Sequence, residues 1–218
     1  MQRHFEAAYV SHVRKLQSHH PYDEAMSLAV GGSFDLIGRL EADLLQTAGL
    51  TSGVSVIDLG CGSGRLAKHL GLRMPNLDYL GIDVVPELIE YARLQSPPHF
   101  RFCINTELAI PAQTASIDFI VAFSLFTHLH LAETLAYLQD AKRALKVGGK
   151  IVFSFLEACN PSHWPLLEAE AIARRDTPSA PITSFIEMSV AKEIARRLEC
   201  GLTVIPCEIG QTVISFSA

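Results

Sequence analysis

The sequence predicts an α/β protein built on a doubly wound, mostly parallel sheet with helices on both faces. Two observations carry this prediction. Short apolar runs alternate with helical stretches over residues 54–156, which is the pattern of parallel strands joined by crossover helices. Near the end of the chain, residues 210–216 alternate in polarity and, with residues 202–206, predict an antiparallel hairpin.

The first 50 residues precede the first predicted strand and have a helical pattern. Apolar residues at positions 5, 9, 13 and 16 predict one helix, and residues 34–48 predict a second that ends at Gly49. Residues 29–33, which include two glycines, connect them. This turn is either a simple connection, which is the favoured interpretation, or a segment that approaches a bound ligand.

The most specific local pattern is the segment 54–65, Val-Ser-Val-Ile-Asp-Leu-Gly-Cys-Gly-Ser-Gly-Arg. It predicts a buried strand, a glycine turn and the start of a helix, an arrangement that binds nucleotides. The dinucleotide fingerprint places its third small residue three positions after the second glycine, where this chain has Arg65. Gly64 comes one position earlier, and Asp58 precedes the first glycine by two positions.

This loop resembles the first motif of the class I S-adenosylmethionine-dependent methyltransferases, and three later segments extend the resemblance. They are Gly-Ile-Asp-Val-Val-Pro at 81–86, a third strand ending at 104–106, and Leu-Lys-Val-Gly-Gly-Lys at 145–150, which predicts a glycine-capped helix end and a turn into a strand over 151–156. The resemblance covers about residues 50–156. It implies a Rossmann-like, seven-stranded sheet with a C-terminal antiparallel hairpin and N-terminal helices, and S-adenosylmethionine as cofactor with S-adenosylhomocysteine as product.

The resemblance also implies where the cofactor binds. The glycine loop would surround its methionine part and ribose, although no chemistry requires the thiol of Cys61. Asp83 would accept the ribose hydroxyls, a role that a carboxylate fills equally well for NAD. Asn105 would contact adenine, and it is explained equally well as a turn residue. The expected cofactor-binding residues are Asp58, Gly60, Cys61, Gly62, Gly64, Asp83, Val84, Asn105, Thr106 and Ser124.

Methyl transfer from a sulfonium is an in-line displacement in which alignment can supply most of the acceleration, so a general base is optional. His128 is the candidate base, although a histidine just before a helix more commonly satisfies backbone N–H groups. After the predicted fourth strand, the sequence Ser-Leu-Phe-Thr at 124–127 replaces the Asn/Asp-Pro-Pro-Tyr/Phe signature of similar enzymes that methylate adenine or glutamine. This difference argues against those acceptors and leaves the acceptor open.

Length and composition predict one domain of 218 residues. We expect a helical cap at 1–50, a cofactor-binding core at 51–156, an insertion at 157–186 that is a possible substrate lid, and a last helix with the terminal hairpin at 187–218. The formal net charge of −5 argues against a nucleic-acid partner. No apolar run is long enough to span a membrane, so no membrane partner is expected.

The five cysteines show no zinc-type spacing, so no metal site is expected, and a reduced, cytoplasmic protein fits them best. The leading hypothesis is a methyltransferase acting on a small-molecule acceptor. One alternative is a non-catalytic protein that binds S-adenosylmethionine. The other is a nicotinamide-dependent oxidoreductase, which Arg65 disfavours because that position calls for a small residue.

Overall fold

The computed structural model describes residues 4–176 and 182–218. The chain divides into two compact units, Met1–Thr106 and Glu107–Ala218. The boundary falls inside the predicted 51–156 core, between the third and fourth strands. Each unit is described by itself below.

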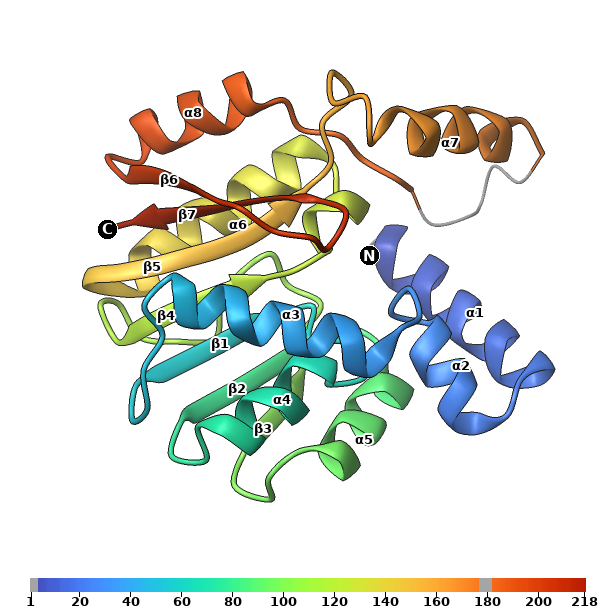
Figure 1. The fold of residues 1–218 in the computed structure, drawn as a ribbon, viewed down its shortest axis with the longest axis horizontal. Coiled ribbons are helices and arrows are strands. Elements are labelled where there is room, and N and C mark those ends of the chain that lie inside the picture. The colour runs from blue at the N-terminus through green and yellow to red at the C-terminus, as the bar shows by residue number, and fades with distance from the viewer. Residues whose placement is uncertain (1–3, 177–181) are drawn as a thin grey trace. The chain divides into compact units, whose positions relative to one another are not determined.

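Three parallel strands and two crossover helices form the centre of the first unit (Figure 1). The strands are β1 (Ser55–Leu59), β2 (Asp78–Asp83) and β3 (Arg101–Ile104), and the helices are α4 (Arg65–Arg73) and α5 (Pro86–Gln95). Leu59 pairs with Ile82, and Asp83 pairs with Ile104. The carboxyl ends of the strands therefore share one edge, and the predicted site residues Asp58 and Asp83 lie at that edge.

Three N-terminal helices complete this unit. They are α1 (His4–His19), α2 (Tyr22–Leu28) and α3 (Phe34–Thr47). The sequence did not predict α2, because a seven-residue helix with only Ala25 and Met26 buried is too short to show a helical period. These two residues pack in one buried cluster with Val13 of α1 and with Val85 and Leu88 at the start of α5. The N-terminal helices are thus fixed beside the β2–α5 connection.

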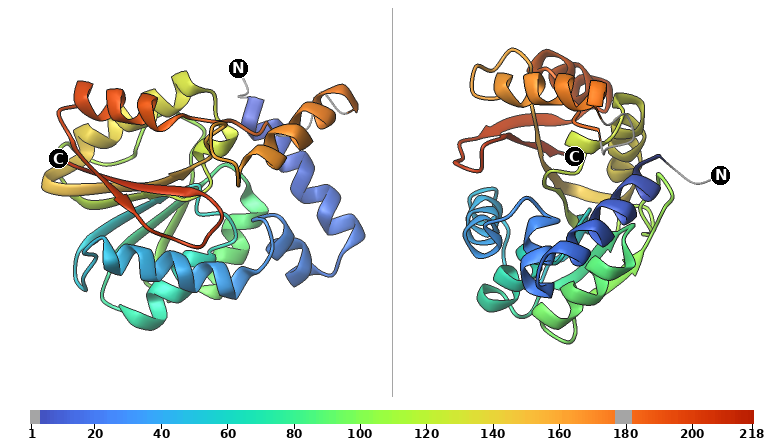
Figure 2. Two further views of the ribbon diagram at one scale, coloured as in Figure 1. Left: turned by 45° about the horizontal axis from the view of Figure 1, so that its top comes forward. Right: turned by 90° about the vertical axis from the view of Figure 1, so that its right-hand side faces the viewer.

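The second unit contains the remaining strands and helices (Figure 2). In order they are β4 (Ile117–Ala122), the 3₁₀ helix η1 (Phe126–His128), α6 (Leu131–Ala144), β5 (Leu145–Phe155), α7 (Trp164–Asp176), α8 (Met188–Arg197), β6 (Gly201–Ile205) and β7 (Thr212–Ser217). Strand β5 is parallel to β4 and antiparallel to β7, which pairs with β6 as the predicted hairpin.

The structure corrects one prediction, the glycine-capped end of α6. The helix ends at Ala144, and β5 begins at the next residue, so Gly148 and Gly149 lie inside the strand. The register shifts there, from Ile117 opposite Leu145 to Phe119 opposite Lys150. A Cβ on Gly149 would lie 2.9 Å from the Lys146 carbonyl oxygen, so the glycine pair forms a tight bulge. The sequence pattern of a capping turn is the same as that of such a bulge.

Among the described residues the strands follow the order β3-β2-β1-β4-β5-β7-β6 in a seven-stranded sheet. This confirms the predicted fold class. Part of the insertion predicted at 157–186 falls on residues 177–181, which lie outside the described residues. Over the described ranges, the helices are all too short or too polar to cross a membrane.

Candidate functional site

The glycine loop lies between β1 and α4 in the first unit. Gly60, Gly62 and Gly64 have φ values of 69°, 54° and 82°, which side chains other than glycine rarely adopt. The backbone N–H groups of Gly60 and Cys61 donate to the carbonyl oxygen of Ile82, at 2.8 and 3.0 Å. The loop is therefore tied to the end of the neighbouring strand, β2.

Asp83 at the end of β2 holds the loop from the other side. Its Oδ2 accepts from the backbone N–H of Gly62 at 2.9 Å, and its Oδ1 accepts from Val84 and Val85 at 2.7 and 3.0 Å. Burial raises the pKa of Asp83, and these three donors oppose the rise. The sequence-predicted residues Asp83, Gly62 and Val84 are thus brought together, with the carboxylate as their common partner.

Asp58 is buried, with 3% of its surface exposed. Its Oδ2 accepts a hydrogen bond of 2.5 Å from the Tyr79 hydroxyl, a partner on β2 that the sequence did not indicate. Burial raises the pKa of Asp58 to about 7, the Tyr79 hydrogen bond opposes this, and the charges of Glu41 and Asp83 add to it. Asp58 is therefore an acid that titrates near neutral pH.

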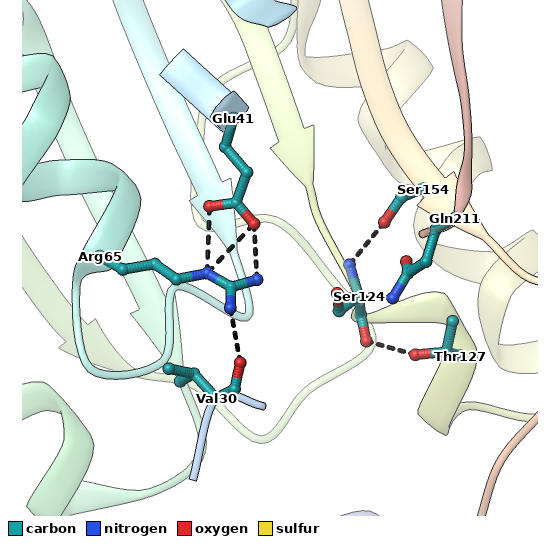
Figure 3. Close-up of polar contacts among 7 residues, drawn as sticks. All are labelled: Val30, Glu41, Arg65, Ser124, Thr127, Ser154 and Gln211. Atoms are coloured by element: carbon teal, nitrogen blue, oxygen red, sulfur yellow. Dashed lines mark hydrogen bonds and ion pairs between the residues drawn. The ribbon is translucent and has the colours of Figure 1, made fainter. Parts of the chain in front are cut away.

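A buried ion pair beside the loop was also missed by the sequence analysis. Arg65, the first residue of α4, places Nη2 2.6 Å from Oε1 of Glu41 on α3 and donates from Nη1 to the Val30 carbonyl at 2.6 Å (Figure 3). Glu41 is 1% exposed, and burial raises its pKa while Arg65 opposes the rise. The sequence contained a sign of this ion pair, because the acid at position 41 falls on the same helical face as the buried residues Gly38 and Leu45.

The 29–33 turn contacts the glycine loop. A Cβ on Gly62 would lie 2.5 Å from Cγ1 of Val30, and the Ser63 hydroxyl donates to the Met26 carbonyl at 2.9 Å. Gly64 is similarly close to α5, since its Cβ would lie 2.7 Å from Cβ of Ala92. The space that these glycines leave open is therefore filled by the protein itself.

The other predicted cofactor residues of this unit lie at the same edge. Asn105 and Thr106 follow β3, and the Asn105 backbone N–H donates to the Asp83 carbonyl at 3.1 Å. Cys61 is buried, which raises the pKa of its thiol, so it is a packed, protonated side chain. Tyr9 of α1 was not predicted. Burial raises its pKa, and the charge of Asp83 raises it further.

We call the glycine loop at 60–64, the 29–33 turn and the side chains of Glu41, Asp58, Arg65 and Asp83 the cradle. The cradle has more acidic than basic groups. It contains three carboxyl groups, on Glu41, Asp58 and Asp83, and one guanidinium, on Arg65, which Glu41 already pairs. Such a surplus of negative charge attracts cationic ligands and disfavours a pyrophosphate. The charges of the cradle therefore fit S-adenosylmethionine, with its sulfonium and ammonium groups, better than a nicotinamide dinucleotide.

The second unit has its own group of polar residues at the carboxyl end of β4, which we call the Ser124 cluster: Ser124, Thr127, Ser154 and Gln211 (Figure 3). The Ser124 N–H donates to Oγ of Ser154 at 2.7 Å, and its carbonyl accepts from the Thr127 hydroxyl at 2.6 Å. Gln211 Nε2 donates to the Ser124 hydroxyl at 2.9 Å. Ser124 has a φ of 57°, and Gln211 Oε1 is buried with no hydrogen-bond partner in the described parts of the chain.

His128 and His130 have different environments. The His128 Nδ1 lies 2.8 Å from the Ile182 carbonyl, to which only a protonated nitrogen can bond, so Nε2 carries the lone pair of the neutral ring. At the start of α6, the His130 N–H donates to the Glu133 carboxylate at 2.9 Å, as in a capping box.

Comparisons with known proteins agree with this description. Residues 56–149 match the family model of the methyltransferase domain. The chain is 31% identical over 118 residues to a ubiquinone biosynthesis O-methyltransferase of Idiomarina loihiensis, covering 52% of this chain and 46% of that protein. It is 33% identical over 102 residues to a tRNA (carboxymethyluridine(34)-5-O)-methyltransferase of Macaca fascicularis, covering 46% of this chain and 14% of that protein.

The fold is also shared with solved structures. One is the magnesium protoporphyrin IX methyltransferase of Synechocystis PCC 6803 with bound S-adenosylhomocysteine, at a TM-score of 0.69 and 12% identity, covering 98% of this chain and 96% of that one. The chain spans about half the length or less of the two related sequences, so only the matched domain is compared with them. The matched domain at 56–149, the related sequences and the shared fold together support a class I S-adenosylmethionine-dependent methyltransferase.

Proposed function

We propose that the chain transfers a methyl group from S-adenosylmethionine to an oxygen atom of a small-molecule acceptor. Both related sequences carry names of enzymes that methylate oxygen. One of them acts on tRNA, but a formal net charge of −5 favours a small acceptor, because RNA binding depends on cationic side chains that neutralise phosphates.

Asp83 can still accept a hydrogen bond from a ligand, and this supports cofactor binding by the cradle. A carboxylate oxygen has two acceptor positions, and Oδ2 of Asp83 uses one of them for Gly62. The second position can accept a ribose hydroxyl. Asn105 beside it would contact the adenine edge, and Asp58 would attract the cationic methionine end. When bound, the cofactor supplies the activated methyl group, and these residues orient it.

The observation that carries the choice of acceptor is the Ser124–Gln211 pair. The Ser124 hydroxyl accepts from Gln211, so its own proton can be donated. Gln211 Oε1 is a buried acceptor without a partner among the described residues, which is unfavourable unless a ligand supplies a donor. The two groups together match a polar substituent beside the reacting oxygen, such as a second hydroxyl, which both donates and accepts and leaves the reacting hydroxyl's own proton for a base. The left-handed backbone of Ser124 is a further cost that a functional residue would explain.

An oxygen nucleophile must also lose its proton, and we assign that role to His128. The hydrogen bond from Nδ1 to the Ile182 carbonyl fixes the ring so that Nε2 is the basic nitrogen. A general base of this kind contributes roughly 10²-fold to 10⁴-fold to a rate.

The test is to incubate the purified chain with S-adenosylmethionine and a panel of phenols, catechols and dicarboxylic acids, each paired with its methyl ether or ester. We expect S-adenosylhomocysteine release with at least one hydroxyl or carboxyl compound and none with its methylated partner. With that acceptor, Gln211→Leu should raise KM, while His128→Gln should lower kcat by roughly 10²-fold to 10⁴-fold.

The alternative, a non-catalytic binding protein, shares the expected binding of S-adenosylhomocysteine and differs in the expected turnover. It expects S-adenosylhomocysteine to raise the melting temperature by roughly 5–11 °C at a hundredfold excess over its dissociation constant. It also expects no turnover with any member of the panel. Turnover on a nitrogen compound alone would contradict the oxygen acceptor and keep the methyltransferase.

A further inference from the structure

We propose that Arg65 and Glu41 are positioning residues that hold the Val30 side chain against the glycine loop, and thereby shape the cofactor cradle before the cofactor binds. The proposal rests on the assignment of this loop to the cofactor and is independent of the acceptor. All of the contacts that carry it lie within the first unit.

Arg65 is suited to this role by its position and by the use of its nitrogens. It directly follows the glycine loop, so its backbone moves with the loop. Its Nε donates to both carboxylate oxygens of Glu41 at 3.1 Å, its Nη2 donates to Oε1 at 2.6 Å, and its Nη1 donates to the Val30 carbonyl at 2.6 Å (Figure 3). One guanidinium thus connects α3, the loop and the turn before α3.

Backbone hydrogen bonds tie the turn to the end of α2, where Val30 and Gly32 donate to the Ser27 carbonyl at 3.2 and 2.8 Å and Gly31 donates to the Leu28 carbonyl at 3.0 Å. These bonds do not reach the glycine loop, so the connection to the loop needs another group. Gly31, Gly32 and Ser33 have consecutive φ values of 88°, 78° and 47°. A Cβ on either glycine would meet nothing within 4 Å, so the space beside these two residues is open. Glycines in such a segment gain much conformational freedom when they are released. The Arg65 hydrogen bond to Val30 opposes that release from the side of the loop.

Because the turn is held in place, the apolar side chain of Val30 lies against the glycine loop. Cγ1 of Val30 lies 2.5 Å from the position of a Gly62 Cβ, and Gly62 donates to Asp83, the expected ribose partner. Val30 is therefore one wall of the cradle. A wall that is fixed beforehand does not lose its conformational freedom when a ligand binds, so the affinity is higher than with a mobile turn.

Stability alone does not account for this pair. A buried ion pair can often be replaced by apolar residues without loss of stability, because burying both charges has a large desolvation cost. The pair Glu41→Met with Arg65→Met is therefore expected to fold. It removes the donor to the Val30 carbonyl while keeping apolar volume between α3 and α4.

The experiment is a calorimetric titration with S-adenosylhomocysteine. We expect the double variant to bind about tenfold more weakly than the unaltered chain, with a melting temperature that changes little. Arg73→Met is the matched control, because Arg73 also joins α4 to α3, through an exposed pair with Asp43, but does not contact the turn. Its affinity should be unchanged.

Val30→Gly tests the same idea without touching the ion pair, and it keeps the test open if the double variant does not fold. It should weaken binding by a similar factor, and combining it with the double variant should weaken binding no further, because both remove the same wall.

Three results would overturn the proposal. Unchanged affinity in the double variant and in Val30→Gly would make the pair purely structural. Tighter binding in Val30→Gly would show that the turn obstructs the cofactor. Absence of binding to the unaltered chain would remove the cofactor assignment and the proposal with it, whereas failure to find an acceptor would leave this result intact.

Discussion

The cradle and the Ser124 cluster use opposite kinds of chemistry. The cradle has three carboxyl groups around one guanidinium, and burial raises the pKa of every one of these acids. The Ser124 cluster consists of hydroxyl and amide side chains without formal charge. The cradle is therefore expected to select ligands by charge and to respond to pH, and the cluster to select by hydrogen-bond direction and to be insensitive to pH.

The largest expected effect is that of Asp83→Asn. One amide oxygen can satisfy two of the three backbone donors, and the amide NH₂ then faces the third, donor against donor. We expect a loss of about 3 kcal/mol in the free energy of unfolding, measured by urea denaturation, and loss of detectable S-adenosylhomocysteine binding. Asp78→Asn is the control, since this acid of β2 is exposed and should change stability by less than about 0.5 kcal/mol. A stable, binding Asp83→Asn would contradict the anchoring role.

Asp58→Asn should have the opposite effect on stability. The pKa of Asp58 is about 7 in the folded chain, above its unfolded value of about 4, so the folded state holds a proton that the unfolded state has lost. Stability therefore falls as the pH rises from about 4 to 7, by up to about 1.4 kcal/mol per pH unit. The Asn variant can still accept from Tyr79 and does not titrate. It should match the unaltered chain near pH 3.5 and exceed its stability at pH 5.5 by roughly 2 kcal/mol. Equal stability at both pH values would place the pKa of Asp58 in the normal range.

The charge of the cradle should also appear in the difference between two ligands. S-adenosylmethionine has a sulfonium that S-adenosylhomocysteine lacks, so ionisation of Asp58 should favour the former. We expect the ratio of their affinities to rise about fivefold between pH 6 and pH 8, and to stay constant in Asp58→Asn. A ratio that does not change with pH in the unaltered chain would show that Asp58 is too well screened to act on the cofactor.

The smallest effect on cofactor affinity is expected from the uncharged region. Ser154→Ala leaves the Ser124 N–H without its partner and should destabilise the fold by about 1–2 kcal/mol. Because no formal charge changes, this loss should be the same at pH 6 and pH 8, and the affinity for S-adenosylhomocysteine should stay within about twofold of the original. A large change in that affinity would mean that the two regions do not work separately.

The two regions also differed in how far the sequence revealed them. The loop residues and Asp83 stand in one contiguous pattern of strand, glycine turn and strand end, so local spacing was enough to place them. Glu41 and Val30 lie 24 and 35 residues before Arg65. Only packing brings them to it, although an acid on a buried helix face was a usable sign.

The Ser124 cluster was harder to predict for the same reason. Gln211 lies 87 residues after Ser124, at the start of the hairpin strand β7. No spacing rule connects a residue after a parallel strand to one before an antiparallel strand, so only the sheet topology shows that they meet. The fold class itself was predictable, because strand alternation and the terminal hairpin depend on local polarity. The Gly148–Gly149 bulge was not, since a bulge and a helix cap use the same residues.

The close neighbours of the loop glycines limit how this chain can change over evolutionary time. Gly62 faces Val30, and Gly64 faces Ala92, each with no room for a further carbon. Both glycines also have positive φ values, so they are expected to be kept and the size limit falls on their neighbours. Homologues that keep the glycine loop should have no side chain larger than Val at position 30 or than Ala at position 92, so a motif usually explained by its ligand would be inherited together with size limits at two positions outside it.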